Sequence, residues 1–452
     1  MQNLPIAPEL QGEVERSSRG SARALELDGL ATASEFRVSD IERARQRLRG
    51  IIRPTPLMRS ATLERILGTE VLLKPENLQK TGSFKLRGAY NRVAALESGE
   101  GRRGVIAASA GNHGQALAYA AGCVGVKATI VMPRTATIVK VDAARSYGQE
   151  VVLEGVDYQE ARRAAERICE RTGALFVDAY DDPFVIAGQG TVGLEIADEV
   201  APEVVLVPVG GGGLIAGIAV ALAARAPDAE IIGVEAAGSP QLSASFAAGA
   251  PVSLGRPVDT IADGLAAGRL GKLPFELIRG RVRRVVTVDD FEIGEALLLM
   301  LERMKLLAEG AGAAALAGAI KIKSELRGRR VVIVVGGGNI DINLLDRIIG
   351  HGLAEAGRLI RISIDLHDRP GELQKLLALI GETGANVRAI RDDRTRRDIP
   401  IGDARVMLEL ETRSAGHIAE IHQRLAEGGY ACVDEDGSFA HAAQNQLCAR
   451  VR

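Results

Sequence analysis

The chain has 452 residues, of which 46% are hydrophobic and 25% charged, which is enough for a large core and for two or three domains. Its net charge of −2 argues against nucleic acid as the main partner. No apolar run approaches the roughly 18 residues of a membrane span, and the acidic start does not predict a signal peptide. The cysteines form no close pair, which predicts a reduced, cytoplasmic setting; they are Cys123, Cys169, Cys432 and Cys448.

Residues 1–36 mix serine, glycine and charge without a period, and we expect a loose arm there. The first helix is expected to begin at Ser39, which with Glu42 matches a capping box. Strand-like runs then alternate with alanine-rich helical stretches, which predicts an α/β fold with parallel sheets covered by helices. The runs lie at residues 71–73, 105–108, 128–132, 151–153, 175–177, 204–209, 231–235 and 331–335.

Lys85 stands in a small-residue turn, TGSFKLRGA at residues 81–89, between the first strand-like run and an apolar helical pattern. Strand-to-helix junctions are where α/β proteins hold ligands. A lysine buried there loses its proton easily, as Schiff-base chemistry requires. A lone lysine on a glycine turn is more often a surface residue, so Lys85 gains weight only from the motifs that follow.

Two further loops open helical patterns directly after apolar strands. The asparagine loop (residues 109–113) places unpaired backbone N–H groups where a carboxylate or phosphate fits. The glycine loop (residues 210–214) lets the backbone wrap an anion with amides. Their members are Ser109, Ala110, Gly111, Asn112 and His113, then Gly210, Gly211, Gly212, Gly213 and Leu214. A Gly-x-Gly-x-x-Gly match at residues 188–193 follows no clear strand and is a weak dinucleotide signal.

The lysine turn, the asparagine loop and the glycine loop, in this order, resemble the fold type II pyridoxal-phosphate enzymes, most closely the threonine/serine dehydratases. Residues 260–264, 309–313 and 336–339 match further segments of that family. The resemblance covers about residues 39 to 345. It implies a tryptophan synthase β-like catalytic domain at residues 37–350, with two lobes of parallel sheet and a smaller lobe inserted near residues 90–190.

The resemblance implies a role for each candidate residue. Lys85 would hold pyridoxal 5'-phosphate as a Schiff base and act as the catalytic base, and Phe84 would pack on the pyridine ring. Asn112 would bond the phenolic oxygen of the ring. The glycine loop would hold the phosphate, and the asparagine loop would bind the α-carboxylate of the substrate.

Two positions depart from the family pattern. Racemases of this family have a second serine where this chain has Ala110, so racemisation is disfavoured, although Ser109 keeps it open. Gly336 stands where relatives present a serine or cysteine to the pyridine nitrogen. Either water or a neighbour such as Glu309 replaces that contact, or the ring nitrogen is less engaged.

The implied reaction is β-elimination of L-threonine to 2-oxobutanoate and ammonia, with side activity on L-serine. Two alternatives stay open. A dehydratase of another 3-hydroxy amino acid, such as 3-hydroxyaspartate, would need a basic residue near the β-substituent. The chain would instead be a weakly catalytic, amino-acid-sensing regulator if Gly336 made the pyridine ring a much weaker electron sink. Lys85 and the intact glycine loop argue against this alternative.

No metal site is expected. Related racemases hold a divalent cation near the segment that matches residues 235–241, where this chain offers only Glu235 as a carboxylate. Hard cations need several oxygen ligands, which leaves a carbonyl-rich site for a monovalent ion open. His417 and His422 show no zinc spacing, and we expect both to be solvated on a helix.

From about residue 358 the pattern becomes β-α-β-β-α with a short final strand, which resembles an α+β, ferredoxin-like ACT regulatory domain at residues 358–435, before a tail at residues 436–452. The resemblance implies that a free amino acid, such as isoleucine, binds near Gly371 and Asn386 at the interface of a homodimer or tetramer. Such an effector would shift activity allosterically and fit isoleucine biosynthesis. The alternative is a dimerisation module without a ligand.

Overall fold

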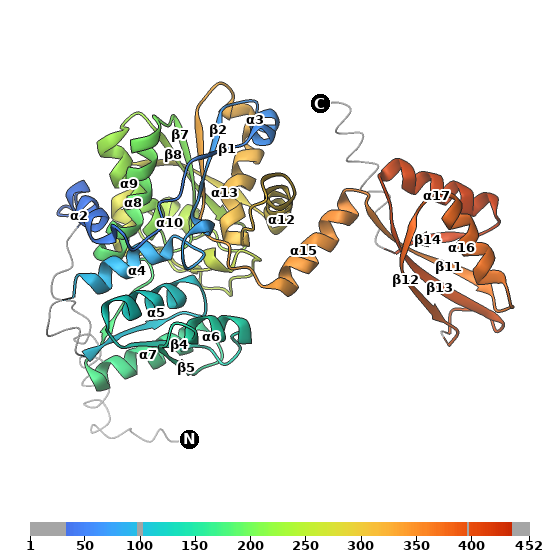
Figure 1. The fold of residues 1–452 in the computed structure, drawn as a ribbon, viewed down its shortest axis with the longest axis horizontal. Helices are drawn as coiled ribbons and strands as arrows, with labels where there is room; N and C mark the ends of the chain where they lie inside the picture. The colour runs from blue at the N-terminus through green and yellow to red at the C-terminus, as the bar shows by residue number, and fades with distance from the viewer. Residues whose placement is uncertain (1–32, 97–102, 396, 436–452) are drawn as a thin grey trace, which may run out of the picture.

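The computed structural model describes residues 33–96, 103–395 and 397–435. The expected tail at residues 436–452, with Cys448, lies outside these ranges, as do residues 1–32 of the expected arm. The described chain forms an α/β body and a C-terminal antiparallel sheet, joined by α15 (Ile342–Glu355) (Figure 1). Among the described residues, no helix has both the length and the apolar character needed to cross a membrane.

The larger sheet has six strands in the order β1-β2-β10-β7-β8-β9. β1 is antiparallel to β2 and every other pair is parallel. The central strands are apolar on both sides, since Val204 and Leu206 belong to the core on one face and Val205 and Val207 to the core on the other. The bounds are β1 (Met58–Arg59), β2 (Val71–Pro75), β7 (Val204–Pro208), β8 (Glu230–Ala236), β9 (Val282–Val288) and β10 (Val331–Val335).

Helices cover both faces of this sheet. One face packs α3 (Ala61–Leu67), α12 (Asp290–Leu299), α13 (Gly310–Lys321) and α14 (Lys323–Leu326). The other packs α2 (Val38–Leu48), α8 (Pro183–Glu199), α9 (Gly213–Arg225), α10 (Gln241–Ala248) and α11 (Lys272–Ile278). Shorter turns are the 3₁₀ segments η2 (Glu76–Leu78) and η4 (Asp263–Leu265) and the π-helical η5 (Met300–Met304).

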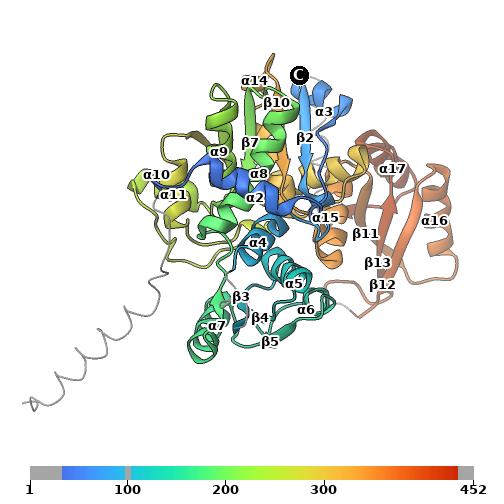
Figure 2. The same ribbon diagram turned by 60° about the vertical axis from the view of Figure 1, so that its left-hand side comes forward.

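The smaller sheet is parallel, in the order β5-β4-β3-β6. Its strands are β3 (Val105–Ala108), β4 (Ala128–Met132), β5 (Glu150–Leu153) and β6 (Leu175–Phe176). One face packs α4 (Lys85–Ala94), α5 (Asn112–Val124) and α6 (Ile138–Arg145), and the other packs α7 (Tyr158–Thr172). Figure 2 shows this smaller lobe below the larger one, with α4 between them.

The Gly-x-Gly-x-x-Gly match lies inside α8 and serves helix packing. A Cβ on Gly190 would lie 2.9 Å from the carbonyl oxygen of Gly217 in α9. A Cβ on Gly188 would lie 2.4 Å from the carbonyl oxygen of Arg87 in α4. These glycines therefore let three helices approach closely, which explains the motif without a dinucleotide.

A cluster of buried charges fixes the start of α4 to the larger lobe. The Arg87 guanidinium, fully buried, donates to both carboxylate oxygens of Glu76 at 2.8 Å and to Glu195 of α8 at 2.6 Å. Lys74 of β2, also fully buried, donates to Glu195 at 2.7 Å. Paired in this way, the charges offset one another. They hold in place the helix whose first residue is Lys85.

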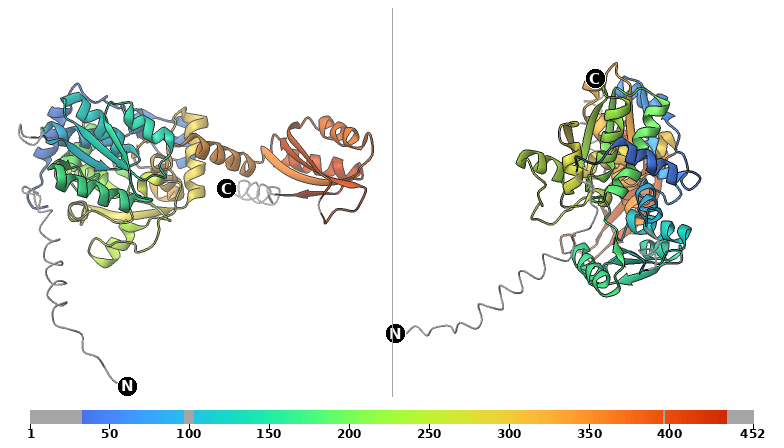
Figure 3. Two further views of the ribbon diagram at one scale, coloured as in Figure 1. Left: turned by 90° about the horizontal axis from the view of Figure 1, so that it is seen from below. Right: turned by 90° about the vertical axis from the view of Figure 1, so that its left-hand side faces the viewer.

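The C-terminal sheet is antiparallel, in the order β12-β13-β11-β14, with helices on one face. Its elements are β11 (Leu359–His367), α16 (Glu372–Glu382), β12 (Asn386–Asp393), β13 (Asp403–Glu411), α17 (Ala415–Glu427) and β14 (Cys432–Asp434). This order is ferredoxin-like, as expected. Figure 3 shows the sheet standing away from the α/β body at the far end of α15.

The eight strand-like runs are all confirmed as strands, with end points within a few residues. β9 was not predicted because Arg283 and Arg284 interrupt its apolar pattern, which an edge strand tolerates. The predicted helix start at Ser39 is wrong. α2 begins at Val38 with Arg37 as the cap, and the backbone N–H of Arg37 donates to Asp40 at 2.7 Å.

The expectation that His417 and His422 are solvated is also wrong. His417 is only 4% exposed, and its Nε2 lies 2.9 Å from the carbonyl oxygen of Thr383. His422 is partly buried, with Nδ1 3.1 Å from the sulfur of Cys432. His417 contacts the residue that caps the end of α16 and His422 contacts β14, which spacing alone did not reveal.

Candidate active site

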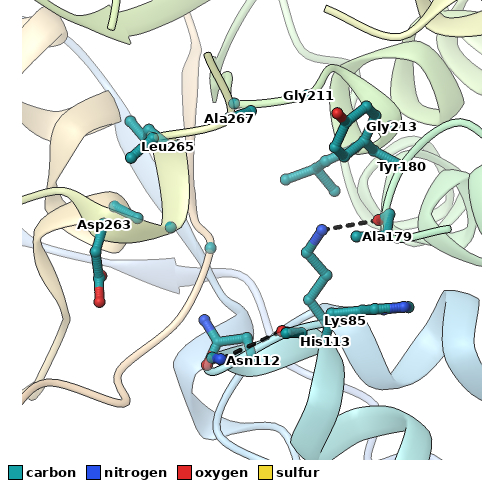
Figure 4. A pocket seen from close by; sticks show the side chains of 18 of the residues that line it. Lys85, Asn112, His113, Ala179, Tyr180, Gly211, Gly213, Asp263, Leu265 and Ala267 are labelled. Atoms are coloured by element: carbon teal, nitrogen blue, oxygen red, sulfur yellow. Dashed lines mark hydrogen bonds between the residues drawn. The ribbon is translucent and has the colours of Figure 1, made fainter. Parts of the chain in front are cut away.

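A cavity of about 310 Å³ lies between the two lobes. Its walls come from segments that follow β3, β6, β7 and β10, so it lies at the carboxyl ends of strands from both sheets, as ligand sites in α/β proteins do (Figure 4). All candidate site residues of the catalytic part line this one cavity: Phe84, Lys85, Ser109, Ala110, Gly111, Asn112, His113, Gly210, Gly211, Gly212, Gly213, Leu214, Glu309 and Gly336.

Lys85 points its amine into the cavity from the first residue of α4 (Figure 4). Nζ donates to the carbonyl oxygen of Ala179 at 2.9 Å and lies 5.2 Å from the centre of the Phe84 ring. Burial lowers the pKa of Lys85 to about 8, against the opposing effect of the Asp178 and Glu309 carboxylates. A useful fraction of the amine is therefore unprotonated near neutral pH, as a Schiff-base nucleophile must be.

The asparagine loop leads from β3 into α5, whose cap residue, Gly111, makes no side-chain cap bond. The first N–H groups of such a helix suit a carboxylate. His113 turns toward the smaller lobe, where its Nε2 lies 2.9 Å from the carbonyl oxygen of Val177. Burial, aided by the nearby Lys85, lowers the pKa of His113 to about 4, so the ring is neutral and Nε2 carries the proton. Nδ1 is a buried acceptor that has no hydrogen-bond partner among the described residues.

Two side chains hold the amide of Asn112. Its Nδ2 donates to Glu309 Oε1 at 2.6 Å, and its Oδ1 accepts from Asn339 Nδ2 at 2.7 Å. Burial, with a further contribution from Asp263, raises the pKa of Glu309 to about 7. The amide therefore has a fixed orientation in the cavity wall, and the Glu309 carboxyl is engaged with Asn112.

The glycine loop leads from β7 into α9, and its cap residue, Gly212, has a φ of 94° that favours glycine. Within the part of the chain that the structure describes, no side chain accepts from the first amides of α9, so they are open to an anion. The Tyr180 ring lies against the loop, since a Cβ on Gly211 would fall 2.2 Å from the ring and one on Gly213 3.0 Å from the Tyr180 backbone. Both conformation and space therefore require glycine here.

Gly336 follows β10, and its carbonyl oxygen accepts from the backbone N–H of Phe84 at 3.1 Å. A Cβ on Gly336 would lie 3.5 Å from Pro208 and 3.6 Å from the Phe84 ring, which is ordinary van der Waals contact. The site therefore has room for a side chain that this chain does not supply.

Among the lining residues that were not predicted as site residues, four have a charged or phenolic side chain: Lys140, Tyr158, Tyr180 and Asp263. Lys140 of α6 and Asp263 of η4 form a 2.6 Å ion pair that joins the smaller lobe to the larger. Tyr180 could have been found from its place just after the strand-like run at residues 175–177. The Lys140 pair left no local signal, because it forms between segments far apart in the chain.

Asp178 shapes the turn that faces Lys85. One carboxylate oxygen accepts from the backbone N–H groups of Tyr180 at 3.1 Å and of Asp181 at 3.0 Å. The other accepts from Arg162 at 3.1 Å. This turn carries both the Ala179 carbonyl and the Tyr180 ring, so Asp178 fixes two groups of the cavity wall.

Among the described residues, no three or more His, Cys, Asp or Glu side chains gather as they would around a metal ion. The carboxylate of Glu235 is fully buried and accepts from the backbone N–H of Leu242 at 2.8 Å, which caps α10. The segment that offered a single carboxylate ligand thus uses that carboxylate to hold a helix.

The two effector candidates lie at opposite ends of the C-terminal sheet. Gly371 precedes α16 and follows the end of β11, with a φ of 92°. Asn386 pairs with Glu411, which pairs with Leu359 at the start of β11. One copy of the chain does not bring the two residues together.

Residues 48–337 match the family model described as "Pyridoxal-phosphate dependent enzyme". An L-threonine ammonia-lyase of Thermotoga maritima is 47% identical over 395 residues, which cover 87% of this chain and 98% of that protein. An L-threonine ammonia-lyase of Geobacter sulfurreducens is 44% identical over 392 residues, which cover 86% of this chain and 97% of that one.

Solved structures give the same likeness. A T.th. threonine deaminase has a TM-score of 0.64 at 40% identity and covers 68% of this chain and 99% of that one. A maize serine racemase has a TM-score of 0.66 at 34% identity and covers 70% of this chain and 98% of that one. Both resemble this chain over most of its α/β body.

Proposed function

We propose that this chain, which belongs to the pyridoxal-phosphate dependent enzyme family of fold type II, converts L-threonine into 2-oxobutanoate and ammonia, with side activity on L-serine. One observation carries the proposal. A buried lysine amine faces a cavity between the N-termini of α5 and α9. The Ser109 hydroxyl accepts from the N–H of the cap residue Gly111, and among the described residues no side chain accepts from the first N–H groups inside either helix. One N-terminus suits the carboxylate of an amino acid and the other suits a phosphate.

The residues present fit pyridoxal 5'-phosphate. Lys85 offers an amine for its aldehyde, and the Phe84 ring offers a flat apolar surface for its pyridine ring. The uncapped start of α9 offers backbone donors for the phosphate, and Asn112 offers an oriented amide for the phenolic oxygen. When bound, the cofactor supplies an electron sink that acidifies the α C–H bond of an amino acid.

Lys85 is the proposed general base for that proton. A base with a pKa near the working pH transfers protons most effectively, and the pKa of Lys85, lowered by burial, is about 8. The Ala179 carbonyl orients the amine when it is free. Threonine then loses its α-proton and β-hydroxyl as water. The enamine takes up water again and releases ammonia, which leaves 2-oxobutanoate.

The asparagine loop is the proposed site for the substrate carboxylate. The backbone N–H groups at the start of α5 are the donors for this carboxylate. His113 is neutral, so it adds no positive charge to the site. Ala110 offers no proton for the opposite face of the α-carbon, which supports elimination over racemisation despite the likeness to a serine racemase.

Threonine is favoured over 3-hydroxyaspartate by the charges of the cavity. Besides Lys85, Lys140 is the one lysine or arginine among the described residues that lines it, and Lys140 is paired with Asp263. A second substrate carboxylate would therefore meet no free cation there. The alternative of a weakly catalytic regulator is disfavoured by the intact Lys85 amine in the cavity.

The C-terminal sheet is proposed to be an ACT-type domain that binds an amino acid such as isoleucine. The match to the Thermotoga relative covers 87% of this chain and so extends well into this part. Because Gly371 and Asn386 lie at opposite ends of one sheet, the proposed effector site needs Gly371 of one copy beside Asn386 of another. The assembly is accordingly proposed to be a homo-oligomer.

The test is the initial rate of 2-oxo acid release from L-threonine by the cofactor-loaded protein, compared with Lys85→Ala. Loss of the base and Schiff-base amine is expected to lower the rate by a factor of about 1,000 or more. Lys80→Ala, which removes an exposed lysine five positions earlier, is the matched control and should keep the wild-type rate.

L-serine and 3-hydroxyaspartate are assayed in parallel. Release from 3-hydroxyaspartate alone would replace the proposed substrate. Full activity in Lys85→Ala, or no release from any of the three, would overturn the proposed reaction.

A further inference from the structure

Two pocket-lining segments of the larger lobe meet beside the cavity. They are the glycine loop after β7 and the η4 turn, which ends at Leu265. Gly210 lies so close to η4 that a Cβ on it would be 3.0 Å from the carbonyl oxygen of Gly264. Within the described chain, no backbone hydrogen bond joins the two segments directly. Something else must set their separation.

Gln241, the first residue of α10, bridges them with its side-chain amide. Its Nε2 donates to the carbonyl oxygen of Gly210 at 2.9 Å and to that of Leu265 at 3.1 Å, and lies 3.5 Å from the carbonyl oxygen of Val209. Its Oε1 accepts from the hydroxyl of Ser239. Both Gln241 and Ser239 are fully buried, so water does not share these contacts.

The orientation of this amide follows from its partners. Backbone carbonyls only accept, so the nitrogen of the amide must face the carbonyls and the oxygen must face the hydroxyl. The backbone of Gln241 is held as well, because Glu235 caps the start of α10 through the N–H of the next residue, Leu242. The Gln241 side chain, fixed at both its backbone and its amide, therefore presents two N–H donors between the two segments.

We infer that Gln241 is a positioning residue for cofactor binding: by bridging Gly210 and Leu265 it holds the glycine loop at the spacing that receives the phosphate. This rests on the proposed assignment of the phosphate to that loop. An apolar side chain of equal size would fill the space but leave the Gly210 carbonyl without a donor among the described residues. The Leu265 carbonyl would keep its bond from the backbone N–H of Ala267 and the Ser239 hydroxyl 3.2 Å away, so the bridge between the two segments would be lost. The loop would then relax, and its amides would no longer converge on one anion.

Gln241→Leu in the full-length holoenzyme tests the bridge. Equilibrium dialysis, followed by the absorbance of the bound cofactor, is expected to show about tenfold weaker retention of pyridoxal phosphate, since about one well-formed hydrogen bond is lost. The ³¹P resonance of the bound phosphate should shift and broaden. Gln149→Leu is the control, because it removes a glutamine bond to the backbone, to Ala128 N–H, in the smaller lobe. It should leave retention and the ³¹P line unchanged.

Gln241→Glu separates the donor from the side-chain shape. A protonated carboxyl can still donate to one carbonyl, whereas the ionised form repels both, and burial favours protonation. Retention by Gln241→Glu, divided by that of wild type, should therefore fall at least several-fold between about pH 5.5 and about pH 8.5. Wild type and Gln241→Glu share Lys85, Glu235 and Asp263, so any pH dependence that comes from these residues cancels in the ratio.

Wild-type cofactor affinity and an unmoved ³¹P line in Gln241→Leu would overturn the inference. If Gln241→Leu fails to fold, the ratio for Gln241→Glu decides, and a ratio that does not change with pH overturns it. Turnover of threonine by wild type is measured beside these experiments. An active wild type with unaffected Gln241 variants removes the role of Gln241 alone, whereas an inactive wild type with weakened Gln241 variants removes only the proposed reaction.

Discussion

Gly336 is a glycine that its surroundings do not demand. It is not among the glycines with positive φ, and an added Cβ would make only ordinary contacts with Pro208 and the Phe84 ring. The Glu309 carboxyl, which could have replaced a missing side chain, is hydrogen-bonded to Asn112. The missing group is therefore a chemical feature of the site and not a result of packing.

We predict that Gly336→Ser changes the absorbance of the bound cofactor and the turnover of threonine. The added hydroxyl would reach the ring nitrogen and strengthen the electron sink. A several-fold change in kcat is expected for one added hydrogen bond. Gly336→Ala is the control, since it adds the same Cβ without a hydroxyl. Identical spectra and rates in the two variants would mean that the hydroxyl makes no contact with the ring.

Single residues of the site differ in how far sequence could find them. Lys85, Asn112 and the glycine loop stand at strand-to-helix junctions, where local pattern and the family resemblance point to the same positions. Tyr180 follows the strand-like run at residues 175–177, which could have marked it, whereas Lys140 becomes part of the wall only when the two lobes come together. Contacts of that kind depend on tertiary structure, so no local pattern marks them.

At the scale of elements, α6 and η4 close the cavity from opposite lobes through the Lys140–Asp263 pair. The Lys140 side chain is 24% exposed and that of Asp263 59%, so the pair contributes at most about 1 kcal/mol. A contact that weak can form and break during turnover. The pair is therefore suited to holding the lobes together over a bound substrate without locking them.

We predict that Lys140→Met or Asp263→Asn raises the KM for threonine about threefold, because closure over the substrate loses its ion pair. The exchanged variant, Lys140→Asp with Asp263→Lys, should recover part of the loss. Raising the ionic strength should weaken binding in wild type and not in the single variants. Additive effects in the exchanged variant would mean that the two side chains act independently.

Elements were predictable where pattern and burial agree. The strands buried on both faces were all found, since each consists mostly of apolar residues. β9 was missed because an edge strand can hold the charges of Arg283 and Arg284. The glycine motif in α8 gave a misleading signal because close helix packing and phosphate binding both select glycine.

At the scale of the whole molecule, the C-terminal sheet meets the α/β body through few contacts. α15 leads into β11, and Arg358 donates to Glu302 of η5 at 2.6 Å. A signal from an effector must therefore pass through α15 and η5, or through a second copy of the chain.

The strand order of the larger sheet could not be predicted from local pattern, because β10, which comes late in the sequence, lies between β2 and β7. No strand order was therefore predicted for this sheet.

We predict that isoleucine binds the full-length protein with measurable heat and changes the threonine kinetics, and that Asn386→Ala abolishes both effects. Asn386 also donates to Glu411 at 3.0 Å, so Glu411→Ala serves as the control. That control breaks the same bond but keeps the asparagine, and it should still bind isoleucine. No heat and no kinetic change with the wild-type protein would leave the sheet as an assembly module.

The buried charge cluster around Arg87 determines which lobe carries which part of the site. It fastens Lys85 to the larger lobe, which also carries the glycine loop and Gly336. The asparagine loop belongs to the smaller lobe. Opening the cleft would therefore let product leave and a new amino acid enter while the coenzyme stays with the larger lobe. Residence of the coenzyme would thus be uncoupled from the catalytic cycle, and one loading could serve many turnovers.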